Sequence, residues 1–410
     1  MSGGPVQDGG PVHGGTPAQD GTPVHGGVPV QDRGRARGDA APEAVPLVDL
    51  AAAHAEVADE VRAGIDRVLA SGAFVKGPEV AAFEREYAAF AGIRHCVGAA
   101  NGTDALELAL RVLDLPPGSG VVLPANTFVA TAEAVLRAGL RPVLVDADPE
   151  YLLMDPERAA AALPGAAALL PVHLFGQLAP MGPLLAAADG RPVVEDAAQS
   201  QGARQHGRSW YGRIAATSFY PGKNLGAYGD AGAVLTDDDA LADAVRLTGD
   251  HGARDRYRHE RFGFNSRLDA LQAVVLRAKL RRLPVWNAAR RAAAARYDEL
   301  LGGLDGLALP RTAPGNEHVR HLYPVRIGPG RDRDAVLAAL HAAGIGAGVH
   351  YPVPVHLQPA FRHLGHREGT FPVAERAARE LLSLPLHPHL TEAGQLRVAE
   401  ALARALGGRR

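Results

Sequence analysis

The residue with the clearest chemical potential is Lys223, which lies in the segment Ser218–Gly232. Four glycines and one proline in that segment favour a constrained turn over a helix. A lysine held in such a turn can lose its proton more easily than one on a solvated helix face, because desolvation disfavours the charged ammonium form. The neutral amine that results is the nucleophile that Schiff-base formation requires. An ordinary surface lysine is the alternative interpretation of the turn alone.

A candidate partner for this amine is the carboxylate of Asp196, which follows the apolar run Pro192–Glu195. We expect Asp196 to lie at the end of a buried strand. A buried carboxylate is costly unless it is paired with a cation or a donor. Its partner is either a helix terminus or an arginine, or else the protonated ring nitrogen of a bound heterocycle.

A possible anion site lies at Asn101-Gly102-Thr103, between an expected strand (95–100) and an expected helix (105–113). Asn101 or Thr103 can cap that helix, and Gly102 lets the backbone approach a ligand. A helix N-terminus of this kind can hold a phosphate. A plain N-cap without a ligand is the alternative, since such caps are common.

The elements that must position these residues are short apolar strands that alternate with helices. The expected strands are 121–123, 142–145, 168–172, 192–195, 214–219 and 231–236. Continuous apolar runs of this kind indicate a parallel sheet with helices on both faces. Ligands bind beyond the carboxyl ends of such strands. Polar and aromatic residues fall at those ends, namely Asn126, Phe128, His173, Asp196 and Gln199.

The chain is predicted to have three parts. Residues 1–41 carry a period-six repeat rich in glycine and proline, which predicts a disordered low-complexity tail. Residues 42–283 are expected to form a large α/β domain with a mostly parallel sheet sandwiched by helices. Residues 284–410 are expected to form a smaller α+β domain, with strands at 321–327 and 346–350 and helices at 287–301, 335–343 and 391–407.

Composition narrows the functional classes. The 410 residues are 47% hydrophobic with a net charge of −2, which argues against a nucleic-acid or membrane-surface partner. A single cysteine, Cys96, excludes an intramolecular disulfide and a multi-cysteine metal site. We predict no metal, because the histidine pairs 363/366 and 387/389 lack a carboxylate cluster. No apolar run could span a bilayer and no secretory signal is apparent, so we expect a cytoplasmic protein.

These residues together match what pyridoxal 5′-phosphate (PLP) needs from a protein. The cofactor needs a lysine, a carboxylate for its pyridine nitrogen, a phosphate site and an apolar face. Lys223 and Asp196 could supply the first two. A nucleotide-binding P-loop does not fit around Lys223, because position 217 is threonine and position 224 is asparagine.

Three runs carry a resemblance to a known family. They are Val194–Ala203, Ser218–Gly232 and Asn265–Ala273. In this order they resemble the DegT-type sugar aminotransferases, which are PLP enzymes of the aspartate-aminotransferase fold. The resemblance covers about residues 45–405 and leaves out only the repetitive tail.

The resemblance implies a role for each matching residue. Lys223 would form the Schiff base and move the proton, and Asp196 would pair with the pyridine nitrogen. Gln199 would contact the ring hydroxyl, and Phe128 would stack on the ring. The residues implied for the phosphate are Gly102, Thr103 and Ser218, together with Asn265 from the neighbouring subunit. This last assignment implies a homodimer with composite active sites.

The resemblance also implies a substrate class. The runs His173–Met181 and Phe219–Gly226 are most similar to enzymes that aminate C3 of dTDP-linked 3-keto-6-deoxyhexoses, with glutamate or glutamine as donor. The segment holding His350, Tyr351 and His356 matches the substrate side of the family, although these histidines could also be structural. Two alternatives stay open, an aminocyclitol-forming transaminase acting on a keto-inositol and a PLP-binding regulator without turnover.

Overall fold

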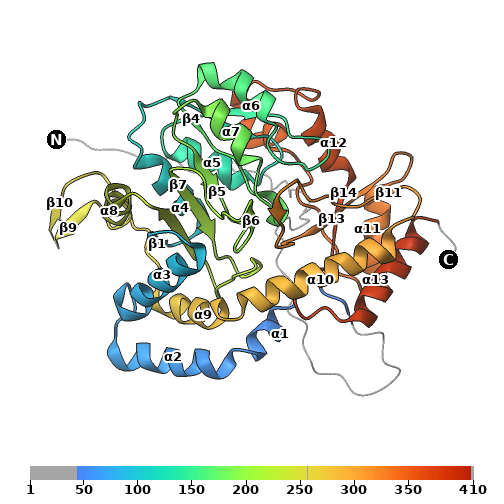
Figure 1. The fold of residues 1–410 in the computed structure, drawn as a ribbon, viewed down its shortest axis with the longest axis horizontal. Helices are drawn as coiled ribbons and strands as arrows, with labels where there is room; N and C mark the ends of the chain where they lie inside the picture. Colours follow the sequence, from blue (N-terminus) through green and yellow to red (C-terminus); the bar gives the residue numbers. More distant parts are fainter. Residues whose placement is uncertain (1–43, 256, 408–410) are drawn as a thin grey trace, which may run out of the picture. The chain divides into compact units, whose positions relative to one another are not determined.

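The fold is built on two groups of hydrogen-bonded strands that meet at their edges (Figure 1). The computed structural model describes residues 44–255 and 257–407, so the predicted tail lies outside the described residues. One group has the order β1 (His95–Ala99), β8 (Gly232–Thr236), β7 (Ile214–Ser218), β5 (Val194–Asp196). The other has the order β3 (Arg141–Val145), β2 (Gly120–Pro124), β4 (Ala168–Leu169). Single parallel bridges from Leu169 to Val193 and from Val172 to Asp196 join the two groups into one sheet.

The sheet is mostly parallel, as predicted. The strand β8 runs antiparallel to both of its neighbours, β1 and β7. The pairs β5–β7, β2–β3 and β2–β4 are all parallel. The carboxyl ends of the parallel strands therefore share one edge of the sheet, which is where ligands bind in open α/β folds.

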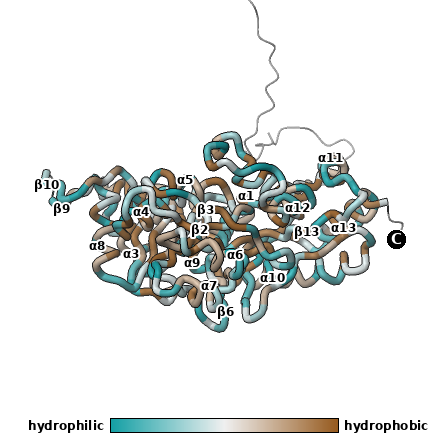
Figure 2. The backbone as a smooth tube through the Cα atoms, turned by 90° about the horizontal axis from the view of Figure 1, so that it is seen from above, coloured by the Kyte–Doolittle hydropathy of each residue, from teal (hydrophilic) through white to brown (hydrophobic). Residues whose placement is uncertain are grey.

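Both faces of the sheet are buried, and alternate residues of each strand serve opposite faces. In β7, Ile214 and Ala216 pack into the cluster that includes α4 (Gly102–Arg111) and α5 (Val129–Arg137). Ala215 packs into the cluster formed with α3 (Gly77–Ala91) and α9 (Ala270–Leu280). In β2, Val122 instead faces α6 (Pro156–Ala162) and α7 (Met181–Ala188). This alternation explains why the strands read as continuous apolar runs. The hydrophobic stretches at β2 and β3 in Figure 2 lie inside the molecule, with helices on both sides.

The helix predicted over residues 105–113 is confirmed as α4, which begins three residues earlier and ends two residues earlier. The helices of this part are α1 (Leu50–Ala55), α2 (Ala58–Ser71), α3 (Gly77–Ala91), α4 (Gly102–Arg111), α5 (Val129–Arg137), α6 (Pro156–Ala162), α7 (Met181–Ala188), α8 (Asp239–Thr248) and α9 (Ala270–Leu280). Short strands complete it: β6 (Arg204–Gln205), β9 (Ala253–Asp255), β10 (Arg258–His259) and β12 (Asn316–Glu317).

A second core lies at the far end of the long helix α10 (Leu283–Leu301). There an antiparallel sheet has the order β11 (Leu307–Ala308), β13 (Tyr323–Ile327), β14 (Leu381–Leu384). The helices α11 (Arg333–Ala342) and α13 (Glu392–Ala405) pack against it, and Figure 1 shows this group beside the end of α10. The predicted domain boundary falls at the first turn of α10 and stays a prediction.

One predicted strand of this part is wrong. Residues 346–350 form no strand, and Gly348 makes only a single bridge to Ser383 of β14. Glycines at 344, 346 and 348 explain why this chain does not hold a longer ladder, since glycine weakens strands. Three elements of this part were missing from the prediction, namely β11, α12 (Pro372–Glu380) and β14.

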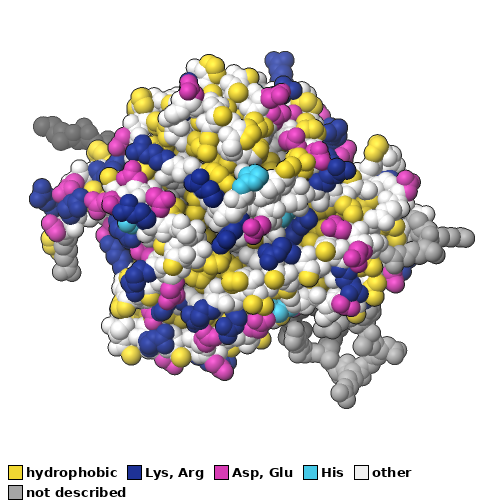
Figure 3. Space-filling view, viewed as in Figure 1, with side chains coloured by type: hydrophobic (Ala, Val, Ile, Leu, Met, Phe, Trp, Pro, Cys, Tyr) yellow, Lys and Arg dark blue, Asp and Glu magenta, His cyan; other side chains and the backbone are white. Residues whose placement is uncertain are grey.

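The surface agrees with the small net charge. On the face seen in Figure 3, basic and acidic side chains are interspersed over the whole surface. None of the helices formed by residues 44–255 and 257–407 is long and apolar enough to cross a membrane.

Candidate active site

The turn that carries Lys223 projects from the carboxyl end of β7. Ser218, the last residue of β7, pairs with Gly232, the first residue of β8. The chain between them is therefore a closed loop at the ligand-binding edge of the sheet. Its first residue, Phe219, is fully buried and packs edge-on against the rings of Phe83 and Tyr87.

Lys223 is half-buried at the ligand-binding edge of the sheet. Burial lowers the pKa of Lys223 to about 8, and the negative charge of Asp196 acts in the opposite direction. The mutual influence shows that the structure brings these two predicted residues together. A substantial share of the Lys223 amine is therefore neutral near pH 8, as nucleophilic attack requires.

The carboxylate of Asp196 is buried at the end of β5 and has fixed donors. The Thr131 hydroxyl donates to Asp196 Oδ2 over 2.8 Å, and the Ala198 N–H donates to Oδ1 over 3.1 Å. No arginine or lysine forms an ion pair with Asp196 in the part of the chain that the structure describes. A buried carboxylate held by two neutral donors can still accept a hydrogen bond from a cationic ring nitrogen.

Gln199 joins the sheet edge to the segment around residue 350. Its Oε1 accepts a hydrogen bond from the Phe175 N–H over 2.6 Å, and its Nε2 donates to Tyr351 Oη over 3.0 Å. Burial raises the pKa of the Tyr351 phenol, so the hydroxyl stays protonated. The Tyr351 ring lies 5.2 Å from the Phe128 ring, centroid to centroid. Phe128 itself is 51% exposed, so its face is available to a ligand.

The predicted phosphate residues also lie together. A β-carbon built on Gly102 would come within 2.5 Å of the Ser218 β-carbon and 3.0 Å of its Oγ. The first turn of α4, including Thr103, therefore opens directly beside the Ser218 hydroxyl. Asn101 caps the helix by accepting from the Asp104 N–H over 2.8 Å, which leaves the N–H groups of Gly102 and Thr103 at the helix start.

His350 is brought to the same site. Its Nδ1 lies 3.0 Å from the Ser383 Oγ, and burial together with the charge of Lys223 lowers the pKa of His350 to about 4. The imidazole is therefore neutral at physiological pH. Asn126, Phe175, His350 and Tyr351 line one small pocket, whereas two larger surface pockets beside Trp210 contain none of the predicted residues.

The prediction for His356 requires correction. Its side chain has no exposed surface, and its Nε2 lies 2.9 Å from Glu375 Oε1. The ring packs edge-on against Phe371, and Glu375 also accepts from the Gly369 N–H. His356 is thus enclosed by core residues, so we assign it to the core and not to a substrate site.

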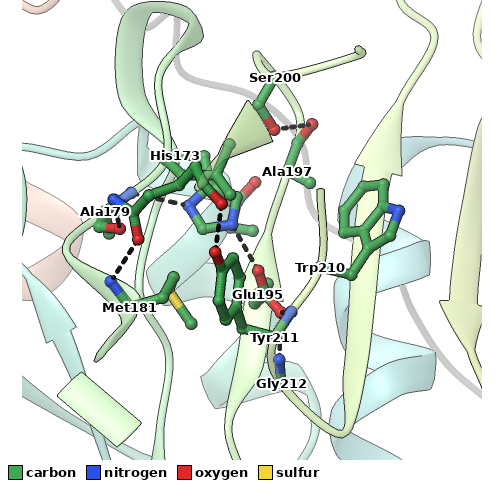
Figure 4. A network of polar contacts seen from close by, with 12 residues as sticks. His173, Ala179, Met181, Glu195, Ala197, Ser200, Trp210, Tyr211 and Gly212 are labelled. Atoms are coloured by element: carbon green, nitrogen blue, oxygen red, sulfur yellow. Dashed lines mark hydrogen bonds and ion pairs between the residues drawn. The ribbon is translucent and has the colours of Figure 1, made fainter. Parts of the chain in front are cut away.

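His173 is bound by buried structural groups (Figure 4). It lies four residues beyond the end of β4, which is shorter than the predicted strand 168–172. Its Nδ1 accepts from the Ala179 N–H over 3.1 Å, so its Nε2 carries the proton and donates to Glu195 over 2.7 Å. Glu195 accepts further hydrogen bonds from the N–H groups of Tyr211 and Gly212. Asp196 and Glu195 are neighbours on β5, and they face opposite sides because strand side chains alternate.

Asn265, like His356, has no contact with Lys223 among the described contacts of its own chain. It is exposed and bridges Asp250, beyond the projecting hairpin of β9 and β10. In Figure 2 this hairpin extends from the rest of the structure.

Two polar partners of the site were not predicted. Thr131, which holds Asp196, lies in the first turn of α5, and its hydroxyl contacts that of Thr127, two residues before the helix, over 2.7 Å. No sequence pattern indicated this contact, because Thr127 is outside the helix. Asn224, next to Lys223, had no signal beyond its position.

The assembled residues fit PLP. An amine, a buried carboxylate without a cationic partner, an exposed aromatic face and a helix N-terminus beside a hydroxyl are its requirements. The residues of the structure hold no group of three or more His, Cys, Asp or Glu suited to a metal, when residues 1–43, 256 and 408–410 are left aside. The α/β sheet with this arrangement at its carboxyl edge is that of an aminotransferase.

Comparison with known proteins supports the same class. Residues 55–403 match the DegT/DnrJ/EryC1/StrS aminotransferase family. The chain therefore belongs to this family and is an aminotransferase.

Individual relatives are similar along most of the chain. The chain is 47% identical over 363 residues to a dTDP-3-amino-3,4,6-trideoxy-alpha-D-glucose transaminase of Streptomyces venezuelae, covering 87% of this chain and 95% of that protein. The crystal structure of S. venezuelae DesV in complex with a ketimine intermediate superposes with a TM-score of 0.86 at 46% identity, covering 90% and 100% of the two chains. The Bacillus subtilis ntda structure with bound cofactor PMP gives a TM-score of 0.79 at 32% identity, covering 85% and 82%.

Proposed function

We propose that the chain is a PLP-dependent transaminase. It moves an amino group from glutamate or glutamine onto the keto carbon, assigned as C3, of a dTDP-linked keto-deoxyhexose. The observation that carries the proposal is the lysine of lowered pKa next to the buried carboxylate of Asp196. Amino-sugar biosynthesis is the corresponding process, because a relative at 47% identity is a dTDP-amino-sugar transaminase.

Lys223 and Asp196 have separate roles in the proposed reaction. When bound, PLP withdraws electrons from the carbon that bears the amino group, which makes the proton on that carbon acidic. The Lys223 amine would hold the cofactor, and as a free amine it would accept and return that proton. Asp196 keeps the ring nitrogen protonated, and the Thr131 hydroxyl and the Ala198 N–H hold its carboxylate in place.

Other residues orient the cofactor. The Gln199 amide, fixed by Phe175 and Tyr351, is available to the ring hydroxyl. Phe128 offers its exposed ring face for stacking. Gly102, Thr103 and Ser218 present backbone and hydroxyl donors to the phosphate, where the positive end of the α4 dipole favours an anion.

The substrate side is assigned to His350 and Tyr351. Both lie at the Lys223 site, and the His350 imidazole is uncharged because burial lowers its pKa to about 4. A neutral imidazole can donate to or accept from a sugar hydroxyl. His356 has no part in this assignment.

We also propose that the working form is a homodimer with composite sites. The loop of residues 219–231 that carries Lys223, called the lysine turn below, exposes two tyrosines: Tyr220 is 52% and Tyr228 is 42% exposed. Phe262, beside the β9–β10 hairpin, is fully exposed. Exposed side chains of this size are ones that a partner subunit could cover. Asn265 follows this segment and makes no contact with its own Lys223, so it is available to the phosphate at the partner's site.

A mixing experiment tests the composite site. Lys223→Ala and Asn265→Ala should each be nearly inactive alone. Mixed and re-associated in equal amounts, they should recover about a quarter of wild-type activity, because half the dimers are hybrids and each hybrid has one intact site. Recovery no better than the sum of the separate variants contradicts the composite site.

A substrate panel tests the reaction. The purified protein should transfer nitrogen from glutamate or glutamine to a dTDP-3-keto-6-deoxyhexose, detected as the amino sugar by mass spectrometry. Product from keto-inositols instead supports the aminocyclitol alternative. Cofactor binding without product from any ketone supports the regulator alternative. A Lys223→Ala variant that keeps wild-type turnover rejects the mechanism altogether.

A further inference from the structure

A buried hydrogen-bond network begins at Asn224, the residue after Lys223. Asn224 Nδ2 donates to the Val319 carbonyl over 3.1 Å and to Asn287 Oδ1 over 2.9 Å. Because a backbone carbonyl can only accept, the orientation of this amide is fixed. Asn224 Oδ1 must then accept from His321 Nδ1, which lies 3.0 Å away. His321 therefore carries its proton on Nδ1.

Asn287 of α10 continues the network to the cofactor side of the sheet. Its Nδ2 donates to the Gln201 carbonyl over 2.9 Å. The Gln201 amide in turn donates to the Ser218 carbonyl over 2.7 Å and contacts the Thr217 hydroxyl at 3.1 Å. Asn287 thus joins the lysine turn to the segment that follows Asp196 and to the end of β7.

The lysine turn depends on such side-chain contacts. Between Phe219 and Ala227, two hydrogen bonds join backbone groups of the turn. The Lys223 N–H donates to the Tyr220 carbonyl at 2.8 Å, and the Ala227 N–H donates to the Phe219 carbonyl at 2.8 Å. The other supports come from side chains, namely the Asn224 amide and Lys279 Nζ, which donates to the Gly226 carbonyl over 2.7 Å. The place of Lys223 is therefore not fixed by a strand or helix.

The residues of this hydrogen-bond network place no charged side chain beside the Lys223 amine. Burial, and then the charges of Lys223 and Arg290, lower the pKa of His321 well below its usual value. The imidazole stays neutral, so it donates to Asn224 without repelling an ammonium group on Lys223. Asn224, Asn287 and Gln201 are uncharged and almost completely buried.

We propose that Asn287 is a positioning residue for Lys223, acting through Asn224 to hold the lysine turn against the segment that carries Asp196 and Gln199. This role rests on the proposed function, in which the Lys223 amine attaches the cofactor. Removing the Asn287 amide should loosen the turn and let water reach the amine.

The amine can be tested without cofactor. The sequence has three lysines, Lys76, Lys223 and Lys279, so pH-dependent acetylation with peptide mass spectrometry can follow each one in the apoprotein. Lys76 has an exposed side chain and serves as an internal reference. In Asn287→Leu, the titration midpoint of Lys223 should rise by about half a pH unit or more, because solvation favours the charged form. The pH midpoint of the cofactor absorption band should shift as well.

The matched control is Gln395→Leu. Gln395 is a buried amide of α13 that donates to the Ala293 carbonyl of α10 over 2.7 Å and has no link to the lysine turn. Both variants should lose similar stability, and only Asn287→Leu should move the Lys223 midpoint. If Asn287→Leu does not fold, Asn287→Ser offers a smaller change at the same position.

Two outcomes separate this proposal from the proposed function. An unchanged Lys223 midpoint and absorption band in a folded Asn287 variant of lowered stability overturn the positioning role. A wild-type protein that binds no PLP overturns the proposed function, while the acetylation midpoint of the apoprotein still decides whether Asn287 positions the lysine.

Discussion

Gly102 lies so close to Ser218 that residue 102 has no room for a side chain. A β-carbon there would come within 2.5 Å of the Ser218 β-carbon. The backbone of Gly102 has an ordinary negative φ, so close approach and not backbone strain requires glycine at this position. This contact places the start of α4 and the Ser218 hydroxyl side by side, as a phosphate site requires.

Gly102→Ala should therefore weaken PLP binding. The added methyl group must push the first turn of α4 away from Ser218, which separates the phosphate donors. We expect the dissociation constant for PLP to rise about tenfold or more, since each charge-assisted hydrogen bond contributes about 1.5–3 kcal/mol. An absorbance titration of the apoprotein measures this directly. Gly182→Ala, at a helical glycine with no atom within 4 Å of the new β-carbon, should bind as the wild type does.

The adjacent carboxylates Asp196 and Glu195 of β5 should differ in what their replacement by an amide impairs, namely cofactor chemistry for Asp196 and stability for Glu195. Asp196→Asn should leave the fold nearly as stable as the wild type. The amide oxygen can still accept from the Ala198 N–H, and the amide NH₂ can donate to the Thr131 hydroxyl, which is able to accept. The cofactor spectrum and turnover should be lost, since an amide does not keep the pyridine nitrogen protonated. Normal turnover in Asp196→Asn would exclude the proposed role.

Glu195→Gln should instead lower stability. Glu195 accepts from His173 Nε2 and from the N–H groups of Tyr211 and Gly212, so an amide NH₂ must face one of these donors. An unsatisfied buried donor costs about 1–3 kcal/mol. Urea denaturation should show this loss, while the folded variant still binds PLP. Loss of the cofactor band without a change in stability would contradict a structural role for Glu195.

Tyr351→Phe should have a smaller effect on the cofactor. The substitution removes the hydroxyl that accepts from Gln199 Nε2, but Gln199 keeps its hydrogen bond from Phe175 and the ring still packs near Phe128. Loss of one hydrogen bond is worth about 1 kcal/mol, so PLP affinity should fall about fivefold. Equilibrium dialysis can measure it. A change as large as that in Asp196→Asn would show that the tyrosine contacts the cofactor directly.

The stability of the apoprotein should rise with pH near pH 8. Burial lowers the pKa of both Lys223 and Lys279 to about 8 in the folded chain, whereas both are near 10.5 when exposed. Between pH 8 and 9 the unfolded chain therefore binds more protons, and the free energy of unfolding increases by up to about 1.4 kcal/mol per pH unit for each lysine.

Lys279→Met should remove one of these two contributions. The slope of unfolding free energy against pH should fall by the contribution of one lysine, whatever the change in absolute stability from the lost contact with Gly226. Urea denaturation of apoprotein at several pH values between 8 and 9 provides the slope. An unchanged slope would mean that Lys279 is not titrating in this range.

Sequence patterns predicted the sheet and most of its helices, because buried parallel strands read as apolar runs that alternate with helices. The same logic placed Asp196, Phe128 and Gln199 at one edge, where the structure has them. The direction of each individual strand was harder to predict from the sequence. That β8 runs antiparallel depends on its pairing with β1, which lies more than 130 residues earlier in the chain.

The substrate-side residues were harder to predict. Sequence spacing did not distinguish His350, which lies beside Lys223, from His356, which is bound to Glu375 nineteen residues later in the chain. Both follow apolar or glycine-rich segments, and only packing decides which imidazole is enclosed. The Asn224–Asn287 contact is similar, because it joins residues 63 positions apart with no local pattern.

The pairing of Ser218 with Gly232 has a consequence for how such a catalyst could change over generations. Residues 219–231 form a loop that leaves the sheet at Ser218 and returns to it at Gly232. A longer or shorter loop would move the Lys223 amine, while β7 and β8 keep their register. The position of the Lys223 amine can therefore change without a change in the pairing of β7 with β8. Selection can act on that position without affecting the stability of the sheet.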